Sequence, residues 1–368
     1  MTRARGGACE PVVAYVHHEN RTGSMTATVE RLASPLDYAR LAAAELADRI
    51  RRRKAELNAV ILGHYYQRGE IQDVSDFVGD SLGLSQEAAG TDADVIVFCG
   101  VHFMAETAKI LSPEKRVLMP DLRAGCPMAD FVTADALRKM KAEHPDAVVV
   151  AYVNSTAEVK AEADICCTSS NAVRVVESIP RDRPILFVPD KNLADYAAER
   201  TGRDNIIAWE GYCYVHDDLV HEELDRALRE NPDAKVVIHP EARRDLLERA
   251  DYVASTAGMA KLAAEHDALI VGTERGLVDR LREQFPGKRI IPLSRAAICG
   301  NMKMNTLAKL AWCLDHGEYE VTLDEGVRRR AESALRRMLE LSGGWRAPTA
   351  EERRLEEAGL RPRGCGCA

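Results

Sequence analysis

The chain has 368 residues, of which 46% are hydrophobic and 29% are charged, as is typical of a globular protein. A formal net charge of −8 disfavours a surface that binds nucleic acid or an anionic membrane. No apolar run reaches the about 20 residues of a membrane span, and the first residues lack the apolar core of a signal peptide. We therefore expect a cytoplasmic protein with neither nucleic acid nor membrane as a partner.

A strand-like unit occurs three times along the chain. Apolar runs begin at Ala59, Ala147 and Ala234, and an aspartate follows each alanine 17 residues later, at Asp76, Asp164 and Asp251. The offsets between copies are 88 and 87 residues, too long for a solenoid repeat. Within each copy, continuous apolar strands alternate with helical patterns. The sequence therefore predicts an α/β protein with three homologous small parallel-sheet domains around a pseudo-threefold axis.

The repeat also suggests domain boundaries. We expect a disordered leader at 1–33, α/β domains at 34–125, 126–215 and 216–310, C-terminal helices at 311–343 and a flexible tail at 344–368. Ser34 before Pro35 predicts the start of a helix that runs through residues 36–57. The sequence TLDE from Thr322 predicts a capping box at the start of a C-terminal helix.

Polar side chains occupy matching positions at the end of the first strand in every copy. Ligands of α/β proteins bind outside the carboxyl ends of the strands. The repeat aligns three sets of residues: His64, Tyr152 and His239; then Tyr66, Asn154 and Glu241; and, 17 residues after the first set, the hydroxyl residues Ser81, Ser169 and Thr256. Hydroxyls at helix starts suit carboxylate or phosphate groups. The three copies together predict one pocket, at the domain junction, for a small and multiply anionic substrate.

Three cysteines lie near strand ends, one in each copy. Cys213 and Cys299 follow the last strands of the second and third copies and are 86 residues apart, while Cys99 ends an inner strand of the first copy. One thiolate from each domain predicts a metal site with three protein ligands. An iron–sulfur cluster with one open iron fits this pattern, and zinc with His102 or His216 as the fourth ligand competes with it.

The other cysteines have a simpler explanation. Cys126, Cys166, Cys167 and Cys313 are expected to pack as small apolar side chains. No pair among the ten cysteines has C-x-x-C spacing, so any metal ligands come from distant segments.

Nine motifs occur in a fixed order between Ala59 and Leu307: GHYYQ, GDSLGLS, FCGVHFMAETAKIL, YVNSTAEVKAEAD, CTSSNAV, PDKNLADY, GYCYVH, HPEA and NMKMNTL. In this set and order, the chain resembles the quinolinate synthase family, the A-protein of de novo NAD biosynthesis. The resemblance implies an enzyme that condenses iminosuccinate with dihydroxyacetone phosphate to quinolinate, releasing phosphate and two waters. An L-aspartate oxidase or aspartate dehydrogenase would supply the imine as a functional partner.

The resemblance also implies the cofactor and the site residues. A [4Fe–4S] cluster held by Cys99, Cys213 and Cys299 would use its open iron as a Lewis acid, with no net redox chemistry. The implied substrate contacts are His64, Ser81, Tyr152, Asn154, Ser169, His239, Glu241 and Thr256, with Tyr66 and His216 as further active-site residues. We expect Tyr66 and Glu241 to move protons, with Tyr152 as a further catalytic residue. His64 and His239 are expected to orient carboxylates.

Two other functions fit parts of the pattern. The radical enzyme of diphthamide synthesis also has three domains with one cysteine each, but it acts on a protein and does not predict the hydroxyl triad. A non-enzymatic iron–sulfur or zinc sensor leaves the histidine, tyrosine and glutamate pocket without a role. Both explain less of the sequence than an enzyme of the quinolinate synthase type.

Overall fold

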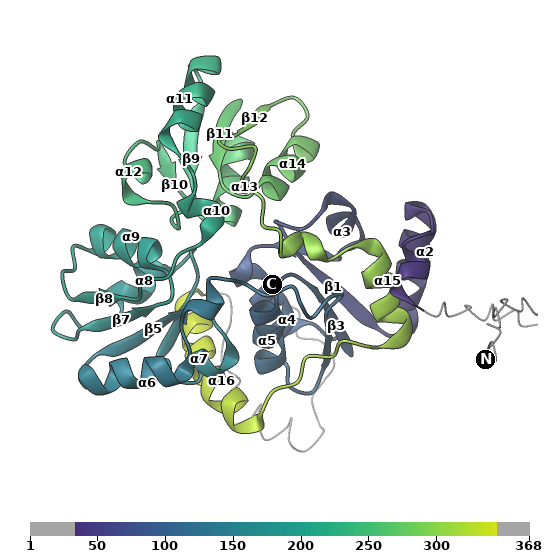
Figure 1. The fold of residues 1–368 in the computed structure, drawn as a ribbon, viewed down its shortest axis with the longest axis horizontal. Coiled ribbons are helices and arrows are strands. Elements are labelled where there is room, and N and C mark those ends of the chain that lie inside the picture. The colour runs from purple at the N-terminus through teal and green to yellow at the C-terminus, as the bar shows by residue number, and fades with distance from the viewer. Residues whose placement is uncertain (1–33, 344–368) are drawn as a thin grey trace, which may run out of the picture. The chain divides into compact units, whose positions relative to one another are not determined.

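The computed structural model describes residues 34–343, in which twelve strands form three parallel four-stranded sheets. The prediction of three similar small α/β domains is confirmed, and Figure 1 shows each sheet with its own helices. None of the described helices combines the length and apolar character needed to cross a membrane. The predicted leader and tail lie outside the described residues.

All three sheets share one strand order, in which the first strand of each repeat is second from the edge. The first sheet, ordered β2-β1-β3-β4, contains β1 (Ala59–His64), β2 (Phe77–Gly79), β3 (Val95–Cys99) and β4 (Arg116–Leu118). The second, ordered β6-β5-β7-β8, contains β5 (Val148–Tyr152), β6 (Ile165–Cys167), β7 (Ile185–Val188) and β8 (Ile206–Ala208). The third, ordered β10-β9-β11-β12, contains β9 (Lys235–Ile238), β10 (Tyr252–Val253), β11 (Ala268–Gly272) and β12 (Arg289–Pro292). The domain boundaries themselves stay predictions.

The repeated aspartate has the same structural role in every domain. One carboxylate oxygen of Asp76, Asp164 and Asp251 accepts a hydrogen bond of 2.8 Å from a backbone N–H of the neighbouring central strand, at Ile61, Val149 and Val236 respectively. Each of these amides lies two residues after the alanine that marks the repeat. Because the edge strand begins only after the aspartate, the side chain supplies the acceptor that the edge strand does not reach.

The helices of the three domains flank these sheets. Domain 1 has α3 (Gly69–Val74), α4 (Ser81–Gly90) and α5 (His102–Leu111); domain 2 has the 3-10 helix η1 (Ala129–Phe131), α6 (Ala134–Glu143), α7 (Ala157–Lys160), α8 (Ala172–Glu177) and α9 (Lys191–Thr201). The third sheet is flanked by α10 (Tyr214–Asp217), α11 (His221–Glu230), α12 (Arg244–Leu247), α13 (Thr256–Glu265) and α14 (Arg275–Gln284). A short 3-10 helix, η2 (Met302–Met304), precedes the C-terminal helices.

The N-terminal helical pattern forms two helices instead of the single helix expected. α1 (Pro35–Tyr38) is separated by a turn from α2 (Ala43–Glu56). Ser34 is the N-cap of α1 as predicted, and its backbone N–H and its hydroxyl both donate to the Asp37 carboxylate. The break lets the Tyr38 phenol donate a 2.6 Å hydrogen bond to Asp315 of α15 (Leu307–His316). The break between α1 and α2 therefore occurs together with a contact between residues that are far apart in sequence.

The last helix, α16 (Glu325–Leu341), packs against α5 of domain 1 and against α7 and β6 of domain 2. The expected capping box at Thr322 is wrong. Asp324 is the N-cap instead, and its carboxylate accepts a 3.0 Å hydrogen bond from the Val327 amide. Asp324 occupies the N-cap position because it is the residue immediately before the first helical turn, where its side chain reaches a free backbone amide.

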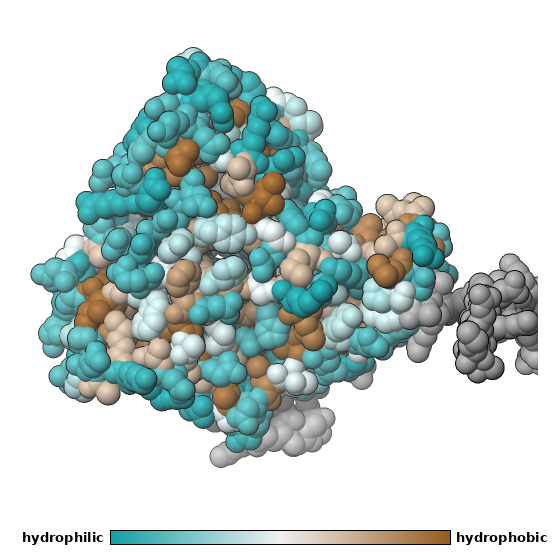
Figure 2. Space-filling view, viewed as in Figure 1, coloured by the Kyte–Doolittle hydropathy of each residue, from teal (hydrophilic) through white to brown (hydrophobic). Residues whose placement is uncertain are grey.

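The face drawn in Figure 2 is mostly hydrophilic, with hydrophobic residues in separate small groups. Among residues 34–343, the exposed large hydrophobic side chains are Leu36, Leu122, Phe131 and Ile298. Three of these four lie within five residues of Cys126 or Cys299.

Candidate active site

One cavity is lined by residues of all three domains. Its lining contains all ten residues predicted to bind substrate or to act in catalysis: His64, Tyr66, Ser81, Tyr152, Asn154, Ser169, His216, His239, Glu241 and Thr256. They lie at the carboxyl ends of strands, in the loops that follow, or in the first turn of a helix. The structure therefore brings together residues that are spread over 193 positions of the chain, from 64 to 256.

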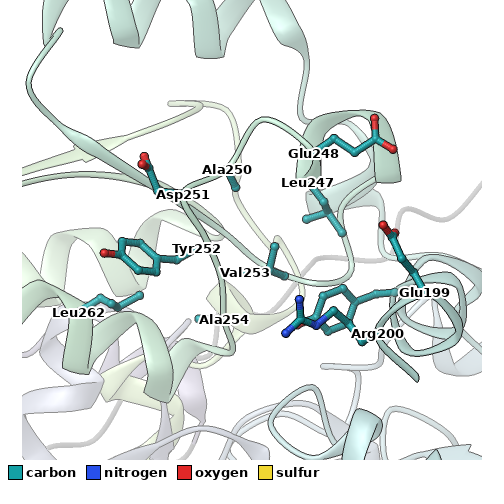
Figure 3. Close-up of a pocket in the computed structure, with 11 residues that line it drawn as sticks. Glu199, Arg200, Leu247, Glu248, Ala250, Asp251, Tyr252, Val253, Ala254 and Leu262 are labelled. Atoms are coloured by element: carbon teal, nitrogen blue, oxygen red, sulfur yellow. The ribbon is translucent and has the colours of Figure 1, made fainter. Parts of the chain in front are cut away.

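A second cavity lies between α9 of domain 2 and the α12–β10–α13 segment of domain 3 (Figure 3). Its lining includes Glu199, Arg200, Glu248 and Tyr252 and none of the predicted site residues. The charged side chains there are exposed. The buried ionisable groups that chemistry needs are in the first cavity.

Cys99 is not among the cysteines of the first cavity, so its predicted role as a ligand is wrong. It is fully buried in an apolar cluster with Val95 and Val97, on the face of the first sheet that packs against α2 and α15. Ile96 and Phe98 belong to the cluster on the opposite face. Successive strand residues point to opposite faces, and the Cys99 side chain is on the face away from the cavity.

Cys126 lines the cavity together with Cys213 and Cys299. These are the three described cysteines that are only partly buried, while the others are buried. Each follows the last strand of its sheet: Cys126 follows β4, Cys213 follows β8 and Cys299 follows β12. Their separations of 87 and 86 residues match the period of the repeat. Alignment on the last strands is the sequence signal that identifies Cys126.

The surroundings of the three thiols fit a metal group held by sulfur. Burial in the surrounding protein raises the pKa of Cys126 to about 12 and that of Cys213 well above its usual value, and the neighbouring cysteines add to both shifts. Backbone amides of Met128 and Ala129 donate to the Cys126 sulfur and act in the opposite direction. A bound metal cation would favour the thiolates that burial disfavours. Three soft donors in one cavity, none in a disulfide, form a suitable ligand set.

His64 and His239 have the same hydrogen bond in domains 1 and 3. The Nδ1 atom of His64 accepts from the Tyr66 backbone N–H at 3.1 Å, and Nδ1 of His239 accepts from the Glu241 backbone N–H at 3.4 Å. Burial lowers the pKa of both imidazoles to about 3. A neutral imidazole that accepts at Nδ1 carries its proton on Nε2. Both histidines therefore present neutral N–H donors.

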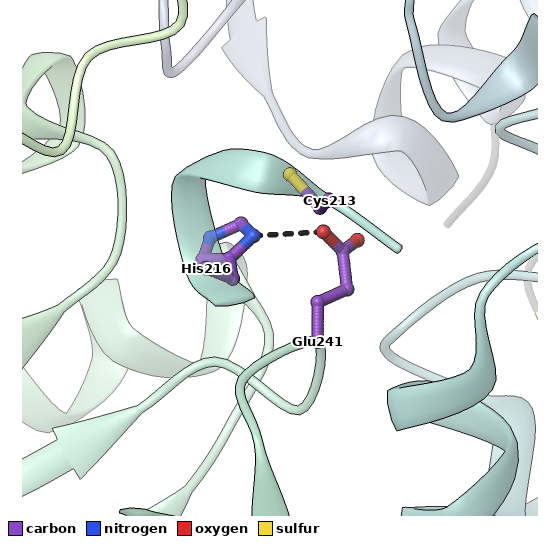
Figure 4. Close-up of side chains that lie close together, drawn as sticks. All are labelled: Cys213, His216 and Glu241. Carbon is purple, nitrogen blue, oxygen red and sulfur yellow. Dashed lines mark hydrogen bonds and ion pairs between the residues drawn. The ribbon is translucent and has the colours of Figure 1, made fainter. Parts of the chain in front are cut away.

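Glu241 is the buried carboxylate at the centre of the cavity, with 3% exposure. It accepts hydrogen bonds from the Tyr152 hydroxyl and from Nδ1 of His216, the latter at 2.8 Å (Figure 4). Burial alone would raise the pKa of Glu241, but His239, His216 and these hydrogen bonds hold it below its ordinary value. Burial and the Glu241 charge raise the pKa of Tyr152 well above its usual value. Glu241 is thus ionised and Tyr152 protonated.

Cys213, His216 and Glu241 each place a possible metal-binding atom within 4.8 Å of the others (Figure 4). Both ring nitrogens of His216 already have partners, because Nδ1 bonds Glu241 and Nε2 lies 2.8 Å from the Thr273 hydroxyl. His102 lies outside the cavity, 3.5 Å from Glu106. His216 is thus held by hydrogen bonds, and His102 is not in the cavity lining with the three thiols.

The hydroxyl residues of the repeat lie at or just before helix starts. Ser81 is the first residue of α4, Thr256 is the first residue of α13, and Ser169 is in the turn before α8. The N-cap of α4, Asp80, accepts from the Gly83 amide at 2.9 Å and from the Ser170 hydroxyl at 2.7 Å. This carboxylate therefore links domain 1 to domain 2 beside the cavity.

Thr273 is a site residue that the sequence reasoning missed. It follows β11, is 1% exposed, and its hydroxyl lies 2.6 Å from the Tyr66 hydroxyl. Strand register makes Gly100 and Pro189 its counterparts in the other two domains. Neither has a polar side chain, so the repeat contains no signal at this position.

The comparisons with known proteins agree with these observations. The model of the family described as quinolinate synthetase A protein matches residues 48–340. A quinolinate synthase of Desulforudis audaxviator is 55% identical over 300 residues, covering 81% of this chain and 97% of that protein. A quinolinate synthase of Dehalococcoides mccartyi is 53% identical over 80% of this chain and 97% of its own length. Quinolinate synthase 2 of Methanosarcina acetivorans is 50% identical over 81% of this chain and 96% of its own length.

These matches confirm the resemblance drawn from the motifs and disfavour the radical-enzyme and sensor alternatives. They extend over all three sheets, from before β1 to within α16. The chain is therefore an enzyme of the quinolinate synthetase A protein family.

Proposed function

We propose that this protein is a quinolinate synthase that condenses iminosuccinate with dihydroxyacetone phosphate, releasing phosphate and two waters, in de novo NAD biosynthesis. One observation carries the proposal: ten predicted polar residues from three domains line one cavity with three cysteines. The names of the similar proteins supply the product. The imine would come from an L-aspartate oxidase or aspartate dehydrogenase, and we propose the cytoplasm as the location.

The cavity has donors suited to a substrate with several anionic groups. His64 and His239 are neutral and offer N–H donors without bringing positive charge. Ser81 and Thr256 add hydroxyls at the starts of ten-residue helices, where backbone amides and the helix dipole favour anions. Together with Asn154 and Ser169, these groups would hold carboxylate and phosphate oxygens.

Tyr66, Tyr152 and Glu241 would move protons. Glu241 is an ionised acceptor, and its hydrogen bond from Tyr152 gives that proton a short path. Burial raises the pKa of Tyr66 well above its usual value, so its phenol is also protonated at rest. A protonated phenol and an ionised carboxylate in one site supply the acid and the base that isomerisation and dehydration require.

Cys126, Cys213 and Cys299 would hold a [4Fe–4S] cluster with one iron free of protein ligands. Such a group, when bound, supplies a Lewis acid that polarises a substrate oxygen. Apolar side chains also line the cavity, namely Val101, Phe103, Met104, Met128, Val215 and Met302. Their role would be to keep bulk water from a hydrolysable imine and from the metal group.

The test is anaerobic purification followed by two measurements. Iron, sulfide and zinc are determined per chain, and quinolinate is measured chromatographically after addition of both substrates. We expect about four irons and four sulfides and quinolinate formation that requires both substrates. Stoichiometric zinc without sulfide would contradict the cluster, and a loaded enzyme that forms no quinolinate would contradict the reaction.

A further inference from the structure

Domain 3 holds Tyr66, a residue of domain 1, from two directions. The Tyr66 hydroxyl lies 2.6 Å from the Thr273 hydroxyl, and the Tyr66 carbonyl accepts a 2.6 Å hydrogen bond from Lys303. Lys303 in turn pairs with Glu274 at 3.0 Å. Thr273 and Glu274 are consecutive residues after β11. One short segment therefore contacts the Tyr66 hydroxyl directly and the Tyr66 carbonyl through Lys303.

Glu274 is fully buried and has several partners. Its carboxylate accepts from the Gly276 amide at 2.6 Å and from the Cys299 amide at 3.1 Å, besides pairing with Lys303. These three partners, one from the first turn of α14 and two from the segment 299–303, fix the backbone next to Thr273. The Thr273 hydroxyl is therefore presented from a rigid support.

The Thr273 hydroxyl lies between two polar groups of the site. The ionised Glu241 carboxylate can only accept, so Nδ1 of His216 donates to it. Nε2 of His216 is 2.8 Å from the Thr273 hydroxyl, which in turn lies 2.6 Å from the Tyr66 hydroxyl. The alternative contact from Tyr66 to His216 is longer, at 3.4 Å.

We propose that Thr273 is a positioning residue for Tyr66. The short hydrogen bond between the two hydroxyls fixes the position of the phenol oxygen, so that Tyr66 meets the substrate in a single orientation. This inference rests on the proposed function, because it assigns a use to Tyr66 in that reaction.

The test compares Thr273→Val with Thr273→Ser in the anaerobic holoenzyme. Valine has the shape of threonine without the hydroxyl, so kcat for quinolinate formation should fall by about 10- to 100-fold, a part of what acid–base groups contribute. The KM values should change by less than about threefold, since uniform substrate binding is retained. Serine should restore most of kcat. Thr201→Val is the matched control, because it removes a buried hydroxyl that bonds only helix carbonyls.

A double-mutant cycle tests whether Thr273 acts through Tyr66. Tyr66→Phe with Thr273→Val should be no slower than Tyr66→Phe alone, because the hydroxyl that Thr273 orients is already absent. Losses that multiply, or a Thr273→Val enzyme with unchanged kcat, would overturn the proposal.

Crystal structures of the two Thr273 variants provide a readout that does not need the reaction. The Tyr66 hydroxyl should keep its position in Thr273→Ser and move from it in Thr273→Val. An unmoved phenol in Thr273→Val would count against Thr273 whether or not quinolinate is the product. If the phenol moves but the wild-type holoenzyme makes no quinolinate, the proposed function fails and the structural role of Thr273 stands.

Discussion

His216 and Glu241 form a buried pair in which Nδ1 and Oε2 are 2.8 Å apart. The pair joins α10, which follows the second sheet, to the turn after β9. Since Tyr152 donates to the other carboxylate oxygen, donors from two domains converge on one acceptor. A charged Glu241 therefore requires both Tyr152 and Nδ1 of His216 to act as donors.

Glu241→Gln should abolish turnover and leave the metal group in place. The amide nitrogen of glutamine is a donor, so it must face either Tyr152 or His216, both of which also donate. We expect kcat to fall by at least about 100-fold. Quinolinate formation and iron content measured on the same sample check this. Glu248→Gln, which changes an exposed carboxylate of the second cavity, is the control. Retained activity in Glu241→Gln would remove this carboxylate from the mechanism.

Replacement of single cysteines should separate ligands from core residues. Cys126→Ser, Cys213→Ser and Cys299→Ser should each lose most of the bound iron, since each removes one of three thiolates. Cys99→Ala should keep its iron and lose about 1 kcal/mol of unfolding free energy from the small cavity created. Iron analysis and urea denaturation distinguish the two classes. Iron loss in Cys99→Ala with iron retained in Cys126→Ser would reverse the assignment made here.

Gly276→Ala should disturb the support of Tyr66. A Cβ atom at this position would lie 2.8 Å from a Glu274 carboxylate oxygen, 2.8 Å from Lys303 Nζ and 2.9 Å from the Gln67 carbonyl oxygen. One of these polar partners must move, at a cost of about 1–3 kcal/mol in unfolding free energy. Gly90→Ala is the control, since its added methyl group meets no atom within 4 Å. Equal stability and equal kcat in the two variants would contradict the rigid support.

The buried histidines should make the fold sensitive to acid. The pKa of His64 is about 3 in the folded protein, below its ordinary 6.5, because burial disfavours the charged form. As pH falls below the ordinary value, the unfolded state binds a proton that the folded state does not. Stability is thus fully present above that pH and is lost toward the folded-state pKa, at about 1.4 kcal/mol per pH unit.

Urea denaturation between pH 6 and pH 5 checks this. His64→Gln should lower the pH slope of the unfolding free energy by about 1.4 kcal/mol per unit, the contribution of one proton. His239→Gln should do the same, because burial gives His239 the same folded-state pKa of about 3. Slopes equal to that of the wild type would show that these imidazoles titrate normally in the folded protein.

The repeat predicted most of the site because equivalent positions of the three copies have similar polar residues. Polar positions at His64, Tyr152 and His239 recur because each lies at the carboxyl end of the equivalent strand in its own sheet. Thr273 could not be found this way, since its role exists in one domain only. Its partners, Tyr66 and His216, lie 207 and 57 residues away in sequence.

The error at Cys99 has a different physical cause. In a parallel sheet covered on both faces, every strand residue is apolar, and alternation no longer marks which face a side chain occupies. Ile96 and Val97 look alike in sequence but belong to opposite clusters. The break between α1 and α2 likewise could not be predicted from the local sequence pattern, because Asp315, which accepts a hydrogen bond from Tyr38, is 277 residues away.

The three cavity cysteines lie in connections beyond the last strand of each sheet. All twelve strands can therefore pair without any of these thiols, and we expect the polypeptide to fold first and to receive its inorganic group afterwards. Once bound, that group would act as a cross-link between three connections that the backbone joins only at long range. Its loss to oxygen would then loosen how the domains are held together and leave each sheet intact.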